Sequence, residues 1–393
     1  MEGVRMFVYL DNSATTKQYD KVTEKMLQCM KEQFGNPSSL HRLGIAAEKE
    51  IKDARRTVAN VLQAKEEEIY FTSGGTESDN TAILGAAKAG KRRGKKIITS
   101  KIEHPAVLEA CRYLEQKEGF CCIYLDVDKA GKVNLEQLKK EIDEETILIT
   151  IMHVNNELGT IQPISEIGTM KKEGTLFHTD AVQSFGKEKI KLDHSDIDLL
   201  SLSGHKIHGP KGIGALYIKQ GIHIPSFIYG GGQEKGFRSG TENVPAIAGL
   251  GKAVQVAAED LHEKTKHVRN VRQHLMEGIQ EKIPEVQINS PTGELCSPYI
   301  LNVSFLGCRG EVLLHTLEQK GIFVSTGSAC SSKKKGSHVL KAAGLSDEAI
   351  EGAVRFSFSE DNTLEEMDYV LEETGKAVAS MRRLRGAMGK KRG

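Results

Sequence analysis

Short apolar runs alternate with amphipathic segments through the first 220 or so residues of the chain. We expect strands at residues 69–72, 96–100, 121–125, 147–153, 176–180, 199–203 and 213–218. Between them, apolar residues recur every three or four positions, which predicts helices at residues 39–63, at 76–89 and from Pro105 onward. Most of these strands are unbroken in their hydrophobicity, as strands covered on both faces are. The pattern therefore predicts an α/β domain built on a mostly parallel sheet.

The pattern changes near Pro245. Apolar residues at helical spacing continue to residue 279 and predict one long helix that ends before Pro284. Beyond it we expect a second domain with strands at 299–305 and 354–358 and a helix at 311–320. Residues 381–393 hold six basic residues and no acid, which indicates a frayed, solvated terminus, with an RNA contact as the alternative.

Polar side chains follow several of the predicted strands, at the edge where parallel sheets bind ligands. Lys206 comes after the strand 199–203, with His205 directly before it and Ser203 at the end of the strand. A lysine amine reacts with a carbonyl group only when it is neutral, so burial or nearby cations must lower its pKa from roughly 10.4. The placement favours a carbonyl cofactor bound through Lys206 over an ordinary surface lysine.

A glycine-rich turn at residues 73–77 joins the first of these strands to a helix. Glycines such as Gly75 let backbone N–H groups approach an anion, and Thr76 adds a hydroxyl group at the helix N-terminus. These features indicate a phosphate site, although a tight turn capped by threonine explains the same residues.

Asp180 ends the strand 176–180, and Gln183 lies three residues later. A carboxylate here would pair with a protonated ring nitrogen and keep a pyridine cofactor electron-withdrawing, while Gln183 would reach a ring oxygen. The alternative is an aspartate that caps a helix.

Three further polar residues have two interpretations each. His104 follows the strand 96–100 and would either stack on a flat ring and move protons or cap the helix that Pro105 begins. Asn155 would donate to a ring oxygen or a substrate carboxylate, or simply form a turn. Arg355 lies on the face of its strand opposite Val354 and Phe356, where it is either a clamp for a carboxylate or a surface arginine.

Cys330 lies in a small, polar segment followed by lysines at 333–335. Such a segment buries little apolar surface, so we expect a mobile loop with an exposed thiol. The lysines favour the thiolate, which is the reactive form. An incidental surface thiol is the alternative.

Composition narrows the possibilities. The formal net charge of +1 and the absence of a run of about 18 apolar residues give no sign of a nucleic-acid or membrane partner. The first ten residues do not form a signal peptide, and seven cysteines in 393 residues are no disulfide framework. We expect a cytoplasmic protein without a metal site.

Taken in order, these motifs closely resemble those of the cysteine desulfurases, a branch of the class V aminotransferases. The resemblance runs nearly end to end. It rests on residues 10–16, 36–39, 72–80, 103–105, 154–160, 178–183, 203–212, 238–243 and 327–330.

The resemblance implies the type I pyridoxal-phosphate fold, with a mostly parallel seven-stranded sheet and a smaller α+β domain. The large cofactor-binding domain would span 16–258, and the small domain would comprise 1–15 and 259–393 and carry the Cys330 loop. Lys206 would bind the cofactor covalently. On the cofactor ring, His104 would stack on the face, Asp180 would pair with the nitrogen, and Gln183 and Asn155 would lie near the phenolic oxygen. The implied phosphate contacts are Gly75, Thr76, Ser203, His205 and the neighbouring subunit's Thr241. Arg355 and Asn155 would hold the substrate carboxylate.

The implied reaction converts L-cysteine to L-alanine and leaves a persulfide on Cys330, with Lys206 as the base. The sulfur would pass to an iron–sulfur scaffold or a tRNA-thiolating enzyme, and the enzyme would be a homodimer. A selenocysteine lyase or an aminotransferase of the same fold is the alternative, and a non-catalytic sulfur-relay protein would require a broken lysine or cysteine motif. The lysines at 333–335 and the basic tail depart from the family pattern and leave the acceptor open.

Overall fold

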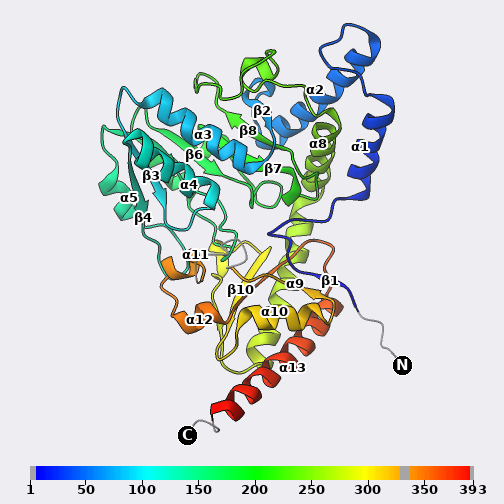
Figure 1. Ribbon diagram of the computed structural model, residues 1–393, viewed down its shortest axis with the longest axis vertical. Helices are drawn as coiled ribbons and strands as arrows, with labels where there is room; N and C mark the ends of the chain where they lie inside the picture. Colours follow the sequence, from blue (N-terminus) through cyan, green and yellow to red (C-terminus); the bar gives the residue numbers. More distant parts are fainter. Residues whose placement is uncertain (1–5, 328–335, 390–393) are drawn as a thin grey trace.

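The computed structural model describes residues 6–327 and 336–389 of the chain. Figure 1 shows two parts: an upper α/β part that contains the large sheet and a lower, smaller part built around α9 (Leu261–Lys282), β10 (Ile300–Phe305) and α13 (Leu364–Gly389). Strand β1 (Val8–Tyr9), near the start of the described chain, and α13, at its end, both lie in the lower part.

A seven-stranded sheet forms the centre of the upper part. Its order is β2 (Ile69–Thr72), β8 (Gly214–Ile218), β7 (Leu199–Ser203), β6 (Leu176–Asp180), β5 (Thr146–Thr150), β3 (Lys96–Ser100) and β4 (Cys121–Leu125). All pairs are parallel except those that β8 makes with β2 and β7. The prediction of a mostly parallel, seven-stranded sheet is confirmed.

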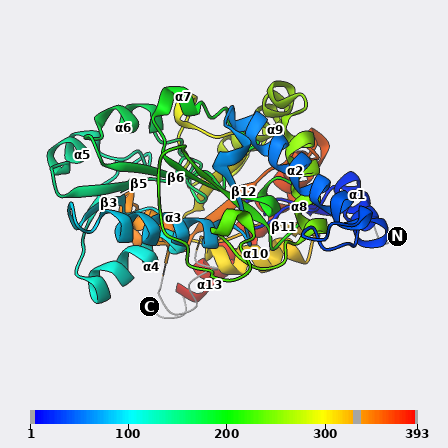
Figure 2. The same ribbon diagram turned by 90° about the horizontal axis from the view of Figure 1, so that it is seen from above.

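Helices cover both faces of this sheet. Figure 2 shows α3 (Gly75–Gly90) and α4 (Pro105–Tyr113) on one side and α5 (Leu135–Glu141), α6 (Ile164–Met170) and α7 (Leu192–Ser195) on the other. Alternation along β7 places Leu199 in the core under α3 and α4 and Leu200 in the opposite core. Each such fully buried leucine stabilises the fold by roughly 1.5–3 kcal/mol. The opposite core also receives α1 (Asp20–Glu32), α2 (Arg42–Leu62) and α8 (Val244–Ala258).

The lower part has its own core and two small sheets. Strand β10 lies between β9 (Val286–Ile288) and β12 (Ala353–Ser357) in antiparallel pairs, and β1 (Val8–Tyr9) pairs in parallel with β11 (Ile322–Phe323). The helices here are α9, α10 (Gly310–Glu318), α11 (His338–Ala342), α12 (Asp347–Glu351) and α13. The residue bounds of the two domains given above stay a prediction.

The N-terminal segment after β1 joins the two parts. Asp11 forms a bridge with Ser357 of β12, and five residues later the Thr16 N–H donates to the carbonyl of His205 at 2.9 Å. The segment from Asp11 to Thr16 therefore leads from β12 to the end of β7, near Lys206.

Two predictions about helices were wrong. The expected single helix between Pro245 and Pro284 is two helices, α8 and α9, because Asp260 adopts a left-handed conformation at φ 52°. The stretch from Met381 is not frayed as far as Gly389, since it is the last part of α13. Its Arg382 donates to the carbonyl groups of Pro284, Glu285 and Leu306, which fastens α13 to the small sheet.

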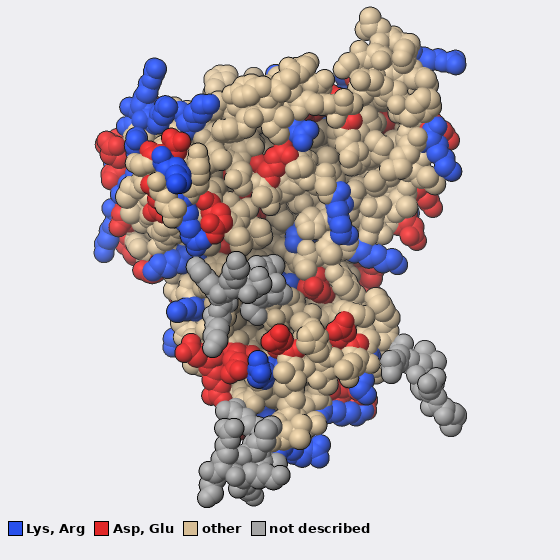
Figure 3. Space-filling model, in the orientation of Figure 1, with Lys and Arg blue, Asp and Glu red and all other residues tan. Residues whose placement is uncertain are grey.

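Basic and acidic side chains are both spread over the face in Figure 3, consistent with a net charge of +1. Among residues 6–327 and 336–389, no helix is long and apolar enough to cross a membrane.

Candidate active site

Lys206 ends the short turn of 3-10 helix η3 (Gly204–Lys206) that follows β7. Its Nζ donates hydrogen bonds to the carbonyl oxygens of Ser13 and Ala14, at 2.5 and 2.8 Å. Burial, followed by the positive charges of Lys187 and Arg355, lowers the pKa of Lys206 to about 7. A large fraction of this amine is therefore neutral at neutral pH, as a nucleophile or a base must be.

Asp180 and Gln183 follow β6 beside this lysine. The Asp180 carboxylate is buried and accepts a hydrogen bond from the Val182 N–H at 2.9 Å, which closes a turn after β6. Among the described residues no helix begins at this point, so Asp180 does not cap a helix. Burial raises the pKa of Asp180, whereas the neighbouring His104 and Lys206 lower it. Gln183 donates to the Ser13 carbonyl at 2.9 Å, and its Oε1 is buried without a partner among the described residues. An orphaned buried oxygen is a place for a bound molecule or a water.

His104 is the N-cap of α4, and its Nδ1 accepts from the Ala106 N–H at 3.1 Å. The capping interpretation is therefore correct, and it fixes the orientation of the ring. Part of the His104 side chain is exposed to solvent. The surrounding protein still removes water from the ring, and this desolvation lowers the pKa of His104, whereas the charge of Asp180 raises it. Capping does not exclude stacking, because only one ring nitrogen is used.

The glycine-rich turn lies where β2 meets α3. Gly74 has φ 149°, which favours glycine, and its place at the N-cap leaves α3 without a side-chain cap among the described residues. A Cβ on Gly75 would lie 2.7 Å from Val182, so only glycine allows this close approach to the turn after β6. Ser203 is packed against the same turn, and Thr76 is exposed at the start of α3. Free backbone N–H groups at a helix N-terminus with hydroxyl groups beside them suit a phosphate.

His205 is tied to the N-terminal segment. Its Nδ1 shares a hydrogen bond with the Thr15 hydroxyl group at 3.2 Å. Burial, and then the charge of Lys206, lowers the pKa of His205 to about 4, so the ring is neutral at neutral pH. It can contact a phosphate as a hydrogen-bond donor, not as a cation.

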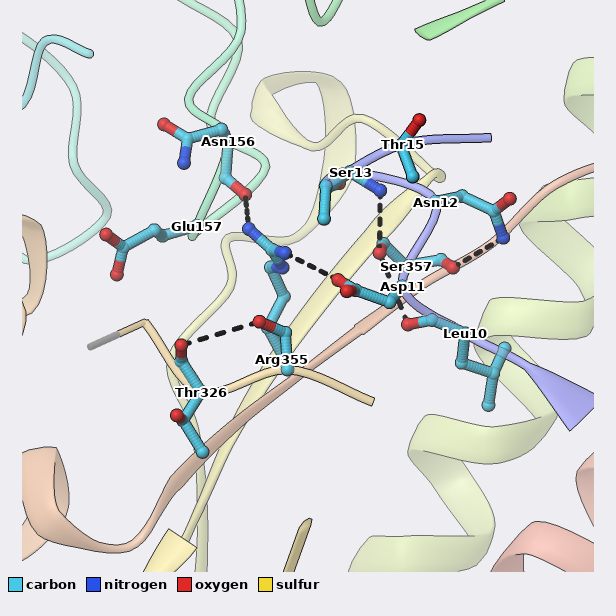
Figure 4. A network of polar contacts seen from close by, with 12 residues as sticks. Leu10, Asp11, Asn12, Ser13, Thr15, Asn156, Glu157, Thr326, Arg355 and Ser357 are labelled. Carbon is cyan, nitrogen blue, oxygen red and sulfur yellow. Dashed lines mark hydrogen bonds and ion pairs between the residues drawn. The ribbon is translucent and has the colours of Figure 1, made fainter. Parts of the chain in front are cut away.

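Arg355 projects from β12 toward the same region (Figure 4). Its Nη2 donates to the Asp11 carboxylate at 2.8 Å and its Nη1 to the Asn156 carbonyl at 2.9 Å. The side chain is buried, and its Nε has no partner among the described residues. Arg355 is therefore not a surface arginine, and it retains one free donor.

The contacts of Asn155 and Thr241 do not by themselves indicate a binding role. The Asn155 oxygen accepts from the N–H groups of Glu157 and Leu158, and its amide donates to the Ile102 carbonyl at 3.0 Å. These contacts favour the turn-forming interpretation, and a role for Asn155 in binding stays a prediction. Thr241 is exposed, in a segment that the ion pair of Arg238 with Glu77 fastens to α3 of its own chain.

Two charged residues at the site, Asp11 and Lys187, were not among those predicted from the sequence. Asp11 lies in the opening motif, but nothing in the sequence pairs it with Arg355. Lys187 is buried, with its Nζ 5.3 Å from the centre of the Tyr299 ring, and burial lowers its pKa to about 8. Its position four residues after Gln183 is the only signal that could have drawn attention to it. Cys330 lies outside the described residues.

The arrangement fits pyridoxal phosphate: a partly neutral lysine, a buried carboxylate, a histidine and a glycine-rich helix N-terminus converge at one edge of the sheet. The fold and this site define a pyridoxal-phosphate enzyme of fold type I.

Comparison with known proteins identifies the family within this fold type. Residues 8–370 match the family described as aminotransferase class-V. Cysteine desulfurase IscS of Clostridium botulinum (strain Hall) is 48% identical over 380 residues, which cover 96% of each chain. Cysteine desulfurase IscS of Methanosarcina thermophila is 50% identical over 96% of this chain and 93% of its own. A solved NifS-like protein superposes with a TM-score of 0.90 at 42% identity, over 95% of this chain and all of the other.

The chain belongs to the class-V aminotransferase family and, within it, to the cysteine desulfurases. The names of these relatives favour this activity over a selenocysteine lyase or an aminotransferase.

Proposed function

We propose that this desulfurase converts free L-cysteine to L-alanine and leaves the sulfur atom as a persulfide on Cys330. The observation that carries the proposal is Lys206, whose amine has a pKa of about 7 and lies beside Asp180 and Gln183 at the carboxyl ends of β6 and β7. The near full-length similarity to cysteine desulfurases supports it.

The residues around Lys206 divide the work of holding pyridoxal phosphate. Lys206 would carry it covalently, Asp180 would hold a proton on the ring nitrogen, Gln183 would donate to the phenolic oxygen, and His104 would lie on the ring. The phosphate would contact Gly75, Thr76, Ser203 and His205, with the partner subunit's Thr241. When bound, the cofactor withdraws electrons from the substrate α-carbon and makes its proton acidic.

Lys206 and Arg355 then act on the substrate itself. The free Nε of Arg355 supports its assignment to the α-carboxylate, because a buried guanidinium donor without a partner favours an anion. Lys206 takes the proton from the α-carbon. A pKa of about 7 suits this task, because the group both accepts and returns a proton near neutral pH.

The sulfur atom of the substrate moves to Cys330 by nucleophilic displacement. The Cys330 thiolate attacks the substrate sulfur, a sulfur–sulfur bond forms, and the carbon–sulfur bond breaks. The electron pair of the broken bond stays with the carbon, which gains a proton and becomes the methyl group of alanine. No outside oxidant or reductant is needed.

The sulfur acceptor is an iron–sulfur scaffold or a tRNA-thiolating enzyme, in the cytoplasm, and the enzyme acts as a homodimer. Exposed apolar side chains on α1 and on the segment that leads into α2 support contact with a second chain. They are Leu27, Met30, Phe34 and Leu40.

The variant Cys330→Ala tests the proposal. It should bind pyridoxal phosphate and keep its colour, yet form neither alanine from cysteine nor a persulfide detectable by mass spectrometry. Cys121→Ala is the matched control, because Cys121 is an exposed thiol on β4 and should be dispensable. Sustained alanine formation by Cys330→Ala would show that another group receives the sulfur.

A further inference from the structure

Glu360 lies three residues after the end of β12, and its two carboxylate oxygens face two different segments of the chain. Oε1 accepts a hydrogen bond from the Tyr19 hydroxyl group, and Oε2 lies 3.6 Å from Nε2 of His208. The Tyr19 and His208 rings are stacked, with their centroids 4.2 Å apart and their planes 12° from parallel. One carboxylate beside β12 therefore contacts both segments at once.

Both of these segments hold Lys206. The segment 13–19 supplies two carbonyl oxygens that accept from the Lys206 amine, and the turn 204–208 contains Lys206 itself. The Tyr19 N–H donates to the His208 carbonyl oxygen at 3.1 Å, which joins the two segments just beyond Lys206. The place of the amine therefore depends on how the two segments are held together.

His208 is buried and has a left-handed backbone conformation, with φ 58°. In a residue other than glycine such a conformation persists only where the surrounding structure holds it. The ring Nδ1 donates to the Lys17 carbonyl oxygen at 2.8 Å, since a carbonyl group can only accept, and Nε2 faces Glu360. The Glu360 carboxylate and the Tyr19 ring are therefore among the contacts that keep the turn of Lys206 in this conformation.

The contact between Glu360 and Tyr19 joins an ionised group to a neutral one. Burial acts against the ionised form of Glu360, but the contact with His208 and the Tyr19 hydrogen bond outweigh burial and lower the pKa of Glu360 to about 2. Burial and the Glu360 charge raise the pKa of Tyr19. At neutral pH a carboxylate thus accepts from a phenol, and a charge-assisted hydrogen bond of this kind is stronger than one between neutral groups.

The stretch of chain that carries Glu360 also carries Arg355. Arg355 lies five residues earlier on β12, and an ion pair fixes its guanidinium group (Figure 4). Between the two, the Ser357 hydroxyl group accepts from the Ser13 N–H at 2.9 Å. The proposed clamp for the substrate carboxylate and the contact that holds the Lys206 turn therefore lie on one short, fixed piece of backbone.

We propose that Glu360 is a positioning residue whose carboxylate holds the Lys206 turn and the segment 13–19 in register with β12, and so sets the Lys206 amine against the α-carbon of a substrate bound at Arg355. The inference rests on the proposed function, because it takes Lys206 as the base and Arg355 as the clamp. Glu360 acts through Tyr19 and His208 and adds no chemical step.

Exchange of the α-proton of L-alanine for deuterium in D₂O tests this placement, because Lys206 removes and returns that proton without Cys330. Glu360→Ala should slow the exchange about tenfold or more, since small misplacement of a reacting group costs rates of this size. The alanine concentration that gives half-maximal exchange should stay near the parent value, because the ion pair of Arg355 is intact. Glu365→Ala, at an exposed acid in the first turn of α13, is the control and should match the parent.

Tyr19→Phe separates position from charge. The Glu360 charge raises the pKa of Lys187, which burial lowers, so a variant at Glu360 also acts on Lys206 through Lys187. Tyr19→Phe leaves that charge in place and removes only the hydrogen bond, so it should still slow the exchange, though less than Glu360→Ala. Its control is Tyr113→Phe, because the Tyr113 hydroxyl group is exposed and makes no hydrogen bond in the described part of the chain. Glu360→Gln keeps an oxygen that accepts from Tyr19 and should fall between Glu360→Ala and the parent.

Backbone hydrogen exchange followed by mass spectrometry gives a readout that needs no turnover. In protein with and without pyridoxal phosphate, peptides that cover 13–19 and 204–209 should exchange faster in Glu360→Ala than in Glu365→Ala. Peptides from β3 and β5, which lie away from these contacts, should exchange alike in both variants. A general loss of stability would instead raise exchange in all of these peptides.

A double-variant cycle gives the last test. Tyr19→Phe should add little in the Glu360→Ala background, where the hydroxyl group has already lost its acceptor. The proposal is wrong if the two effects multiply, or if Glu360→Ala exchanges the α-proton at the rate of Glu365→Ala. If Glu360→Ala does not fold, equal rates in Tyr19→Phe and Tyr113→Phe overturn the proposal. Failure of the proposed function is seen separately, as α-proton exchange at the parent rate in Lys206→Ala.

Discussion

The Arg355 guanidinium group and the Asp11 carboxylate form an ion pair at 2.8 Å that joins the two ends of the chain at the site. Asp11 lies just after β1 and Arg355 in β12, 344 residues apart. The pair holds a buried cation in place while the Nε of Arg355 stays free of partners among the described residues. An arginine fixed in this way has already lost most of its side-chain entropy before a substrate carboxylate arrives.

Arg355→Ala should therefore act mainly on substrate affinity. We expect the KM for cysteine to rise about 10–100-fold, the effect of losing a charge-assisted hydrogen bond, with a smaller change in kcat. Arg355→Lys should fall between the parent and Arg355→Ala, because it keeps the charge without the fork. Steady-state kinetics and inhibition by alanine measure both effects. An unchanged KM with a reduced kcat would remove Arg355 from the substrate carboxylate.

Lys206→Ala should bind pyridoxal phosphate without a covalent link. Borohydride treatment should fix the cofactor to a peptide containing residue 206 in the parent and to no such peptide in the variant, as mass spectrometry can show. Loss of the base should lower kcat by about 10²–10⁴-fold. Lys206→Arg keeps the positive charge but not the nucleophile, so it should fail in the same way. Covalent cofactor at residue 206 is essential to the proposed mechanism, and its absence in the parent would overturn it.

The large sheet could be predicted from the sequence because its strands are short apolar runs that end at polar residues. Leu199 and Leu200 face opposite cores, so a continuous run was the correct signal for a covered strand. The break at Asp260 could not be seen, since the helical spacing of apolar residues continues on both sides of it. A single left-handed residue changes the direction of the chain without changing that periodicity.

The site was predictable only where its residues follow strands. Lys206, Asp180 and His104 share one edge of the sheet because the strands are parallel. The carbonyl groups of Ser13 and Ala14 on Lys206 gave no such signal, because the chain returns to this point from the lower part of the fold. Alternation along β12 separated Arg355 from the core residues, but only the ion pair with Asp11 shows that the arginine is buried.

Lys187 should tune the basicity of Lys206. Its charge is the second largest cause, after burial, of the lowered pKa of Lys206. Removing that charge in Lys187→Met should raise the pKa of Lys206, so less of the amine is neutral at neutral pH. The rate at which apoenzyme takes up pyridoxal phosphate rises with pH as the amine becomes neutral. The midpoint of this rise should move up by on the order of one pH unit in Lys187→Met.

Lys187→Arg is the control for this prediction, because it keeps a positive charge at the same place. Its midpoint should stay within the error of the parent value. Equal midpoints in Lys187→Met and the parent would mean that the charge of Lys187 does not reach Lys206, whatever the two variants do to turnover.

Glu103, next to His104, is a second residue at the site with a shifted pKa. It is fully buried, accepts from the Ser100 hydroxyl group at 2.5 Å and from the Met152 N–H at 2.9 Å, and burial raises its pKa from 4.5 to about 8. Between these two pH values the unfolded chain loses the proton that the folded chain keeps. The unfolded state then binds fewer protons than the folded state, so the free energy of unfolding falls as pH rises through this window.

Glu103→Gln cannot titrate, and its amide can still pair with Ser100 and Met152. We therefore expect the variant and the parent to have similar urea midpoints near pH 5, and the variant to become progressively more stable than the parent as pH rises toward 8. Glu281→Gln, at an exposed position of α9, is the control and should follow the parent at every pH. A constant difference between Glu103→Gln and the parent across this range would mean that the carboxyl group is already ionised in the folded protein, held by its two hydrogen bonds. Burial would then not dominate its pKa.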